Sequence, residues 1–171
     1  MRALAVLGLS YLLMGLETTL LYQAGVGRLA PDLGALGVVF AAANLSLVVG
    51  AVTAMMIGFL SDAFAMGSPV GLYAEVYVLL FLIFRMVFRK LALKGMITSL
   101  MVGFLAPLLC GVLAMFIGWI FDQVFDGYAV AVRAFVPNAL VTAPLAPVVF
   151  FLYERLDRAL TRRRGGSVFF N

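Results

Sequence analysis

The chain has 171 residues, of which 65% are hydrophobic and only 12% are charged, with a formal net charge of +4. A soluble domain has roughly 45–50% apolar and about 25% charged residues, so this composition excludes a soluble globular domain and indicates a protein of the lipid bilayer. The chain contains no histidine, which removes the commonest general base and metal ligand, and its single cysteine, Cys110, cannot form an intrachain disulfide.

The apolar runs predict an all-α integral membrane protein, a bundle of six transmembrane helices in a single domain. A membrane-spanning helix needs about 20 apolar residues, and the chain has room for six with short loops. The spans are predicted at residues 3–22, 31–43, 47–61, 70–88, 97–121 and 135–153, followed by a cytoplasmic basic tail over residues 154–171.

The first three spans carry few polar residues. Glu17 lies inside the first span and reaches either the membrane interface or the bundle interior, and the interface is the less costly placement. Pro31 and Asp32 suit the first turn of the second helix, where a missing N–H does no harm and a carboxylate complements the helix dipole. Asn44 begins a short polar break, which predicts either a helical hairpin or a broken helix.

Small residues follow in the third span, at Gly50, Ala54 and Gly58. They recur at helical spacing, so they predict a face on which another helix backbone packs closely.

A corner rich in small residues separates the third and fourth spans. Asp62 ends the third span, and a tight reversal is predicted over Gly67, Ser68, Pro69 and Gly71, followed by Tyr73. Asp62 and Glu75 could form a carboxylate pair of the kind used in proton or cation sites. The favoured alternative is that both lie at the aqueous edge of the membrane, solvated or capping a helix end, because both are near predicted termini.

Prolines interrupt the last two spans. Pro107 predicts a kink or break in the fifth, and Pro137, Pro144 and Pro147 indicate an interrupted sixth helix. A broken helix can expose backbone at a transport site, but kinks that fit neighbouring helices are commoner. Asn138 and Thr142, one turn apart, could hydrogen-bond across a helix interface.

Basic residues set the expected orientation. One cluster follows the fourth span, and six spans place it on the same side as the tail, so both termini are expected in the cytoplasm. We interpret the tail as attracted to anionic lipid and expect no nucleic-acid partner. The tail arginines are Arg155, Arg158, Arg162, Arg163 and Arg164.

Two motifs resemble those of a known family. The segments GFLSD at residues 58–62 and GSPVGLY at residues 67–73 resemble the signature of the MreD family of rod shape-determining proteins. The APDL entry at residues 30–33 and the C-terminal proline-containing helix with its Arg/Asp-rich end are also similar to that family. The turn at residues 44–47 is uncharged here, whereas MreD-like chains usually carry basic residues there.

The resemblance implies a multi-pass, non-enzymatic subunit of the elongasome in the bacterial inner membrane. Such a subunit takes no cofactor and helps to organise sidewall peptidoglycan synthesis and rod cell shape. The implied partners are a bitopic MreC-like protein, the elongasome polymerase and its class B transpeptidase. The corner from Asp62 to Tyr73 would then be a structural corner or a partner contact.

A second function comes from the same resemblance. The MreD fold is similar to that of the substrate-binding subunits of energy-coupling-factor transporters, so the alternative is a subunit that binds a vitamin or another small molecule. An enzyme ranks last, because the spans offer no plausible general base.

Overall fold

In the computed structural model, residues 2–24, 30–64, 71–90, 95–121 and 128–165 are described, and nearly all of them are helical. The prediction of an all-helical chain is confirmed. The described helices are α1 (Arg2–Ala24), α2 (Leu33–Asn44), α3 (Leu47–Phe64), α4 (Leu72–Lys90), α5 (Met96–Phe121) and α6 (Tyr128–Gly165).

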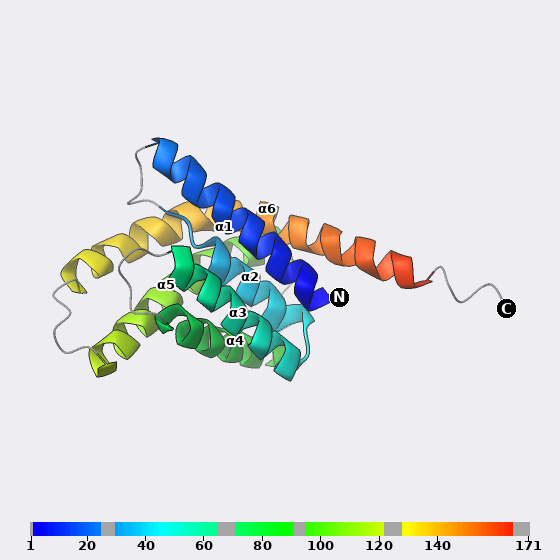
Figure 1. Cartoon of the computed structure of the whole chain (residues 1–171), viewed down its shortest axis with the longest axis horizontal. Coiled ribbons are helices and arrows are strands. Elements are labelled where there is room, and N and C mark those ends of the chain that lie inside the picture. Colours follow the sequence, from blue (N-terminus) through cyan, green and yellow to red (C-terminus); the bar gives the residue numbers. More distant parts are fainter. Residues whose placement is uncertain (1, 25–29, 65–70, 91–94, 122–127, 166–171) are drawn as a thin grey trace.

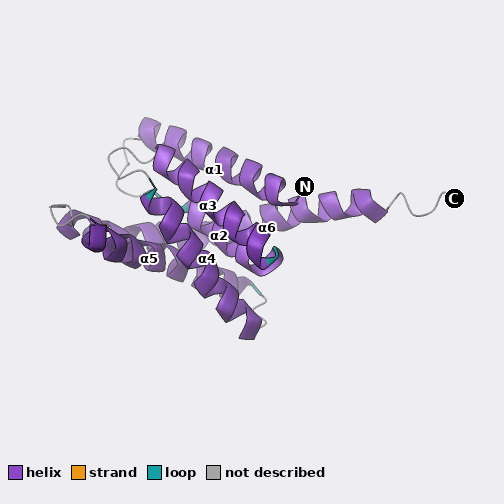
Figure 2. Cartoon of the chain, turned by 60° about the horizontal axis from the view of Figure 1, so that its bottom comes forward, coloured by secondary structure: helices purple, strands orange, loops and turns teal. Residues whose placement is uncertain are grey.

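Successive helices run in opposite directions, so that the start of α1 and the last part of α6 lie toward the same end of the molecule (Figure 1). An ion pair between Arg2 Nε and Asp157 Oδ1, 2.9 Å apart, joins these two segments. The most extensive packing is between α3 and α4 and between α5 and α6. In both views the C-terminal part of α6 projects beyond the other helices (Figures 1 and 2).

The short helix α2 lies at the centre of the bundle and packs against all five other helices. Every residue from Leu33 to Ala42 is buried. Helix α1 contributes a narrow face at four-residue spacing, formed by the buried Val6, Ser10 and Met14. A helix that is apolar all round is normally enclosed by protein or lipid, and here protein encloses α2.

The outer helices expose apolar side chains on the faces turned away from α2. On α3 and α5 these include Val48, Phe59, Met101 and Val112, which are between 45% and 73% exposed. Within the described part of the chain, three segments are long and apolar enough to cross a membrane, namely Leu47–Phe64, Met96–Ile120 and Phe135–Leu160. The bundle of six membrane spans stays a prediction, and so does its likeness to transporter subunits.

The prolines do not interrupt their helices. Helix α5 runs through Pro107, and α6 continues past all three of its prolines, so the expected breaks are wrong, since each proline removes only one intrahelical hydrogen bond. Helix α6 also extends beyond the predicted end of the sixth span, so Arg155 to Arg164 of the predicted basic tail lie in its last turns.

Candidate functional site

The N-terminus of α2 is held by a buried polar cluster. Asp32 is the N-cap residue: its Oδ1 accepts hydrogen bonds from Ala35 N at 2.8 Å and from Tyr77 Oη at 2.7 Å. Its own backbone N–H donates to Thr142 Oγ1 on α6 at 2.9 Å. The helix therefore begins at Leu33, and Pro31 precedes the cap instead of standing in the first turn.

Further polar groups extend this cluster. Ser61 Oγ on α3 donates to Tyr77 Oη at 3.2 Å, and the buried Cys110 thiol on α5 lies beside the Asp32 carboxylate. The half-buried Glu17 carboxylate on α1 lies near the Leu33 backbone N–H and the Asp32 side chain. Glu17 thus turns toward α2, which is the less favoured of its two expected placements. Side chains from five helices meet at this one helix end.

The C-terminus of α2 is held by a cation from α4. Arg85 Nη1 donates to the carbonyl oxygens of Ala42 at 2.9 Å and Leu45 at 2.7 Å. Those carbonyls have no partner within the helix, and a guanidinium there also complements the negative end of the helix dipole. The helix connects to α3 through Leu45 and Ser46 alone. Asn44 is therefore the last residue of the first helix in a tight helical hairpin.

Two glycines on α2 let tyrosine hydroxyls approach its backbone. A Cβ at Gly34 would lie 2.6 Å from Tyr77 Oη, and one at Gly37 would lie 2.7 Å from Tyr153 Oη. Tyr153 in turn shares a 2.8 Å hydrogen bond with Ser10 Oγ on α1. The two glycines therefore leave space for the tyrosine hydroxyl groups. The sequence motifs did not indicate this role.

The corner between α3 and α4 is capped by Asp62. Its Oδ2 accepts from Gly71 N at 2.9 Å, and its Oδ1 accepts from Tyr73 N at 3.0 Å. Gly71 adopts φ +99°, a conformation that glycine tolerates best. These contacts are those of a helix cap, and they join the segments at residues 58–62 and 67–73. Gly67, Ser68 and Pro69 lie outside the described residues.

The described contacts do not pair Asp62 with Glu75. Both oxygens of Asp62 accept backbone hydrogen bonds, while the Glu75 side chain is exposed on the outer face of α4. There it lines a shallow apolar groove of about 540 Å³. The groove residues are Met55, Phe59, Gly71, Ala74, Glu75, Val78 and Leu79.

The small-residue face of α3 is already covered. A Cβ at Gly50 would lie 2.3 Å from the Phe81 ring, and one at Gly58 would lie 2.4 Å from the Ala74 Cα, while Ala54 is fully buried. All three residues therefore pack within the chain, largely against α4. An incoming helix therefore cannot use this face, whereas the α3/α4 groove is open.

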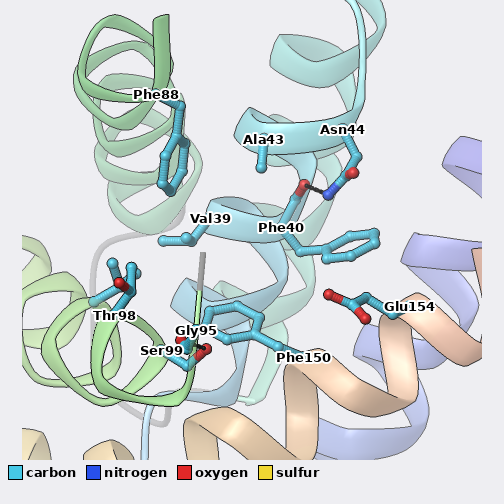
Figure 3. A pocket seen from close by; sticks show the side chains of 11 residues that line it. Val39, Phe40, Ala43, Asn44, Phe88, Gly95, Thr98, Ser99, Phe150 and Glu154 are labelled. Atoms are coloured by element: carbon cyan, nitrogen blue, oxygen red, sulfur yellow. Dashed lines mark hydrogen bonds between the residues drawn. The ribbon is translucent and has the colours of Figure 1, made fainter. Parts of the chain in front are cut away.

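A second pocket, of about 360 Å³, opens at the opposite end of the bundle among α2, α4, α5 and α6 (Figure 3). Its interior is apolar, and Asn44, Thr98, Ser99 and Glu154 supply polar groups. Arg155 and Arg158 are exposed near this end, whereas the side chains of Arg162, Arg163 and Arg164 lie outside the described residues.

The residues that sequence reasoning missed are polar groups inside apolar helices: Ser10, Tyr77, Arg85 and Tyr153. The sequence does contain an indication of their role, because a polar side chain within an apolar run is expected to hydrogen-bond to another group of the protein. Thr142 was expected to bond across a helix interface, and its hydroxyl does so while donating to Asn138 O in its own helix at 2.6 Å.

Comparison of the chain with protein-family models, curated proteins and solved structures finds no match.

Proposed function

We propose that this chain is a non-enzymatic, multi-pass membrane subunit that holds the membrane helix of a partner protein in the α3/α4 groove. The MreD-like segments at residues 58–62 and 67–73 support an elongasome role in the bacterial inner membrane, with an MreC-like partner. Both termini would then lie in the cytoplasm, and the six helices would form one bundle in the bilayer.

The observation that carries this proposal is how the interior polar groups are used. Asp32, Tyr77 and Arg85 hydrogen-bond to groups that belong to the fold itself. A catalytic or transport site instead needs polar groups that converge on an open cavity. The interior therefore supports a scaffold whose activity lies on its outer surface.

The α3/α4 groove has the features of a helix-binding surface. Gly71, where a Cβ would meet nothing within 4 Å, leaves room for a close approach. Phe59 and Leu79, 45% and 39% exposed, offer apolar contacts on either side. Glu75, one turn into α4, would pair with a basic residue where the partner helix leaves the hydrocarbon.

Photocrosslinking tests this assignment. A crosslinker placed at Phe59 or Leu79 is expected to capture a single-pass partner helix, whereas one at the similarly exposed Val112 on α5 is expected to capture lipid only. If the complex purifies intact and neither groove position captures the partner, the groove is not its binding surface. Capture lost in Glu75→Lys and restored by an acidic residue in the partner would identify the ion pair.

The second candidate is a substrate-binding subunit of a vitamin or small-molecule transporter. The pocket in Figure 3 favours it, because its volume falls in the range of about 300–1,000 Å³ typical of ligand sites. A thermal-shift screen with vitamins separates the two functions: stabilisation by a water-soluble compound, lost when the pocket is filled, would support transport.

A further inference from the structure

The pocket among α2, α4, α5 and α6 changes from apolar to polar along its depth. Val39, Phe40 and Val102, which are at most 6% exposed, form its interior. Phe88 and Phe150, each half-buried, form its walls (Figure 3). Asn44 and Glu154 are exposed at the mouth. A ligand that matches this gradient has a long apolar part and a compact polar head.

The mouth presents hydrogen-bond acceptors. The Asn44 side chain donates through Nδ2 to Phe40 O at 3.0 Å, which leaves its Oδ1 as an acceptor. Ser99 Oγ donates to Gly95 O at 3.2 Å, so it too retains acceptor capacity. Glu154 reaches from α6 toward Phe40, across the pocket from Thr98 and Ser99 on α5 (Figure 3). A ligand whose polar head carries several hydrogen-bond donors would complement these acceptors.

Glu154 is the charged side chain among the residues that line this pocket. Its Oε2 lies 3.7 Å from Arg158 Nη2, and the two side chains are 64% and 68% exposed. An exposed pair at this distance contributes little energy and leaves the carboxylate able to bind another cation. The charge complement of the mouth is therefore a cation with N–H donors.

We propose that this pocket binds an aminophospholipid of the phosphatidylethanolamine type. Its ammonium group would contact Glu154 and the Asn44 Oδ1, its phosphate would approach the Thr98 hydroxyl, and one acyl chain would lie against Phe88, Phe150 and Val102. The head group of phosphatidylcholine lacks N–H donors. Phosphatidylglycerol carries a net negative charge, so Glu154 would repel it. This inference rests on the bilayer location proposed above and is independent of the partner.

Lipid retention tests the proposal. The full chain is reconstituted in nanodiscs with equal amounts of phosphatidylethanolamine, phosphatidylcholine and phosphatidylglycerol, then released into mild detergent, and retained lipids are counted by native mass spectrometry. We expect phosphatidylethanolamine to be retained roughly fivefold over phosphatidylcholine, the ratio that corresponds to about 1 kcal/mol of net hydrogen bonding by the ammonium N–H groups, which choline lacks.

Three variants assign the binding to this pocket. Glu154→Gln, at an exposed position, should bring the three lipids to parity without affecting the fold. Ala43→Trp, which fills the mouth from α2, should lower retention of all three. Glu75→Gln, which removes a carboxylate from the other groove, is the matched control and should change nothing.

Equal retention of the three lipids by the unmodified protein would overturn the proposal, as would a preference that survives both Glu154→Gln and Ala43→Trp. Displacement of the lipid by millimolar phosphoethanolamine would assign the pocket to a soluble amine, which would favour transport. Failure of partner crosslinking at the α3/α4 groove would leave this lipid result standing, because the two measurements probe opposite ends of the bundle.

Discussion

At the scale of single residues, neighbouring helices approach closely where a glycine has no side chain. A Cβ at Gly58 would lie 2.4 Å from Ala74 Cα and 2.5 Å from Tyr73 O, both of which are backbone atoms that cannot rotate away. The contact fixes how closely α3 and α4 approach. Helices in lipid gain no hydrophobic drive from their association, so such close packing supplies much of their adhesion.

Substitution of Gly58 should therefore separate α3 from α4. Gly58→Ala is expected to lower the unfolding free energy by about 1–3 kcal/mol, the usual range for overpacking. Gly8→Ala is the control, because a Cβ there meets nothing within 4 Å. Unfolding in mixed micelles measures both. Equal stability of the two variants would show that the α3/α4 contact can relax at no cost.

Tyr77 joins three helices through one hydroxyl group. Tyr77→Phe removes the donor to Asp32 Oδ1 and the acceptor for Ser61 Oγ, and we expect it to cost roughly 1–2 kcal/mol. Tyr11→Phe, at a 53% exposed position, should be neutral. A double-mutant cycle with Ser61→Ala isolates the weaker of the two bonds. Additive losses in that cycle would mean that Ser61 contributes nothing through Tyr77.

At the scale of elements, α2 is a short helix stabilised at both ends by other parts of the chain. Its 12 residues extend about 18 Å, well short of the roughly 30 Å hydrocarbon core. Under the proposed bilayer placement its terminal N–H and C=O groups would lie where water is scarce, so each would need a partner in the protein. Asp32 and Thr142 act at one end, and Arg85 acts at the other.

Arg85 should be the most sensitive charged residue of α4. Arg85→Gln is expected to destabilise the protein by about 1.5–3 kcal/mol, because two carbonyls lose a charge-assisted donor. Arg85→Lys should recover only part of the loss, since lysine lacks the planar fork. Arg89→Gln, on an exposed side chain one turn later, should stay within about 0.5 kcal/mol of the parent. Thermal unfolding of the three variants ranks them directly.

The α3/α4 corner makes a separate prediction. Asp62→Ala should cost roughly 0.5–2 kcal/mol, as for a lost helix cap, because the N–H groups of Gly71 and Tyr73 lose their acceptor. We expect unfolding measurements to show this loss of stability, and we expect the partner still to crosslink at Phe59. Loss of crosslinking at unchanged stability would instead make Asp62 a direct contact residue.

Sequence patterns predicted the helices well and their contacts poorly, for a physical reason. Apolar runs separated by Asp32, Asn44 and Asp62 marked where elements begin and end. A helix that is apolar all round carries no polar face, however, so its periodicity does not say which side meets which neighbour. The pairing of Tyr77 with Asp32 crosses 45 positions and that of Ser10 with Tyr153 crosses 143. No local pattern encodes such distances.

At the scale of the whole molecule, the two ends of the bundle carry different surface features. One end carries the Asp62 corner and the groove beside Glu75, and the other carries the Arg2–Asp157 pair and the pocket mouth at Glu154. Under the proposed orientation the second end lies in the cytoplasm, so partner binding and lipid binding would occur in opposite leaflets.

Cysteine labelling tests this orientation. A membrane-impermeant maleimide applied to intact cells should label Ala63→Cys, at the corner end, and leave Ser46→Cys and Arg89→Cys unlabelled until the membrane is opened. All three positions are exposed, and the native Cys110 is buried, so background labelling is low. The opposite labelling pattern would reverse the assignment of both termini.

The dependence of α2 on distant caps has a consequence for biogenesis. Residues that complete its ends arrive late: Tyr77 and Arg85 follow it by some forty positions, and Thr142 by more than a hundred. While the ribosome is still adding α4, the newly made α2–α3 hairpin has bare carbonyls that bulk lipid cannot solvate. Under the proposed bilayer placement, we therefore expect the hairpin to leave the insertion machinery only after α4 and α6 have been made.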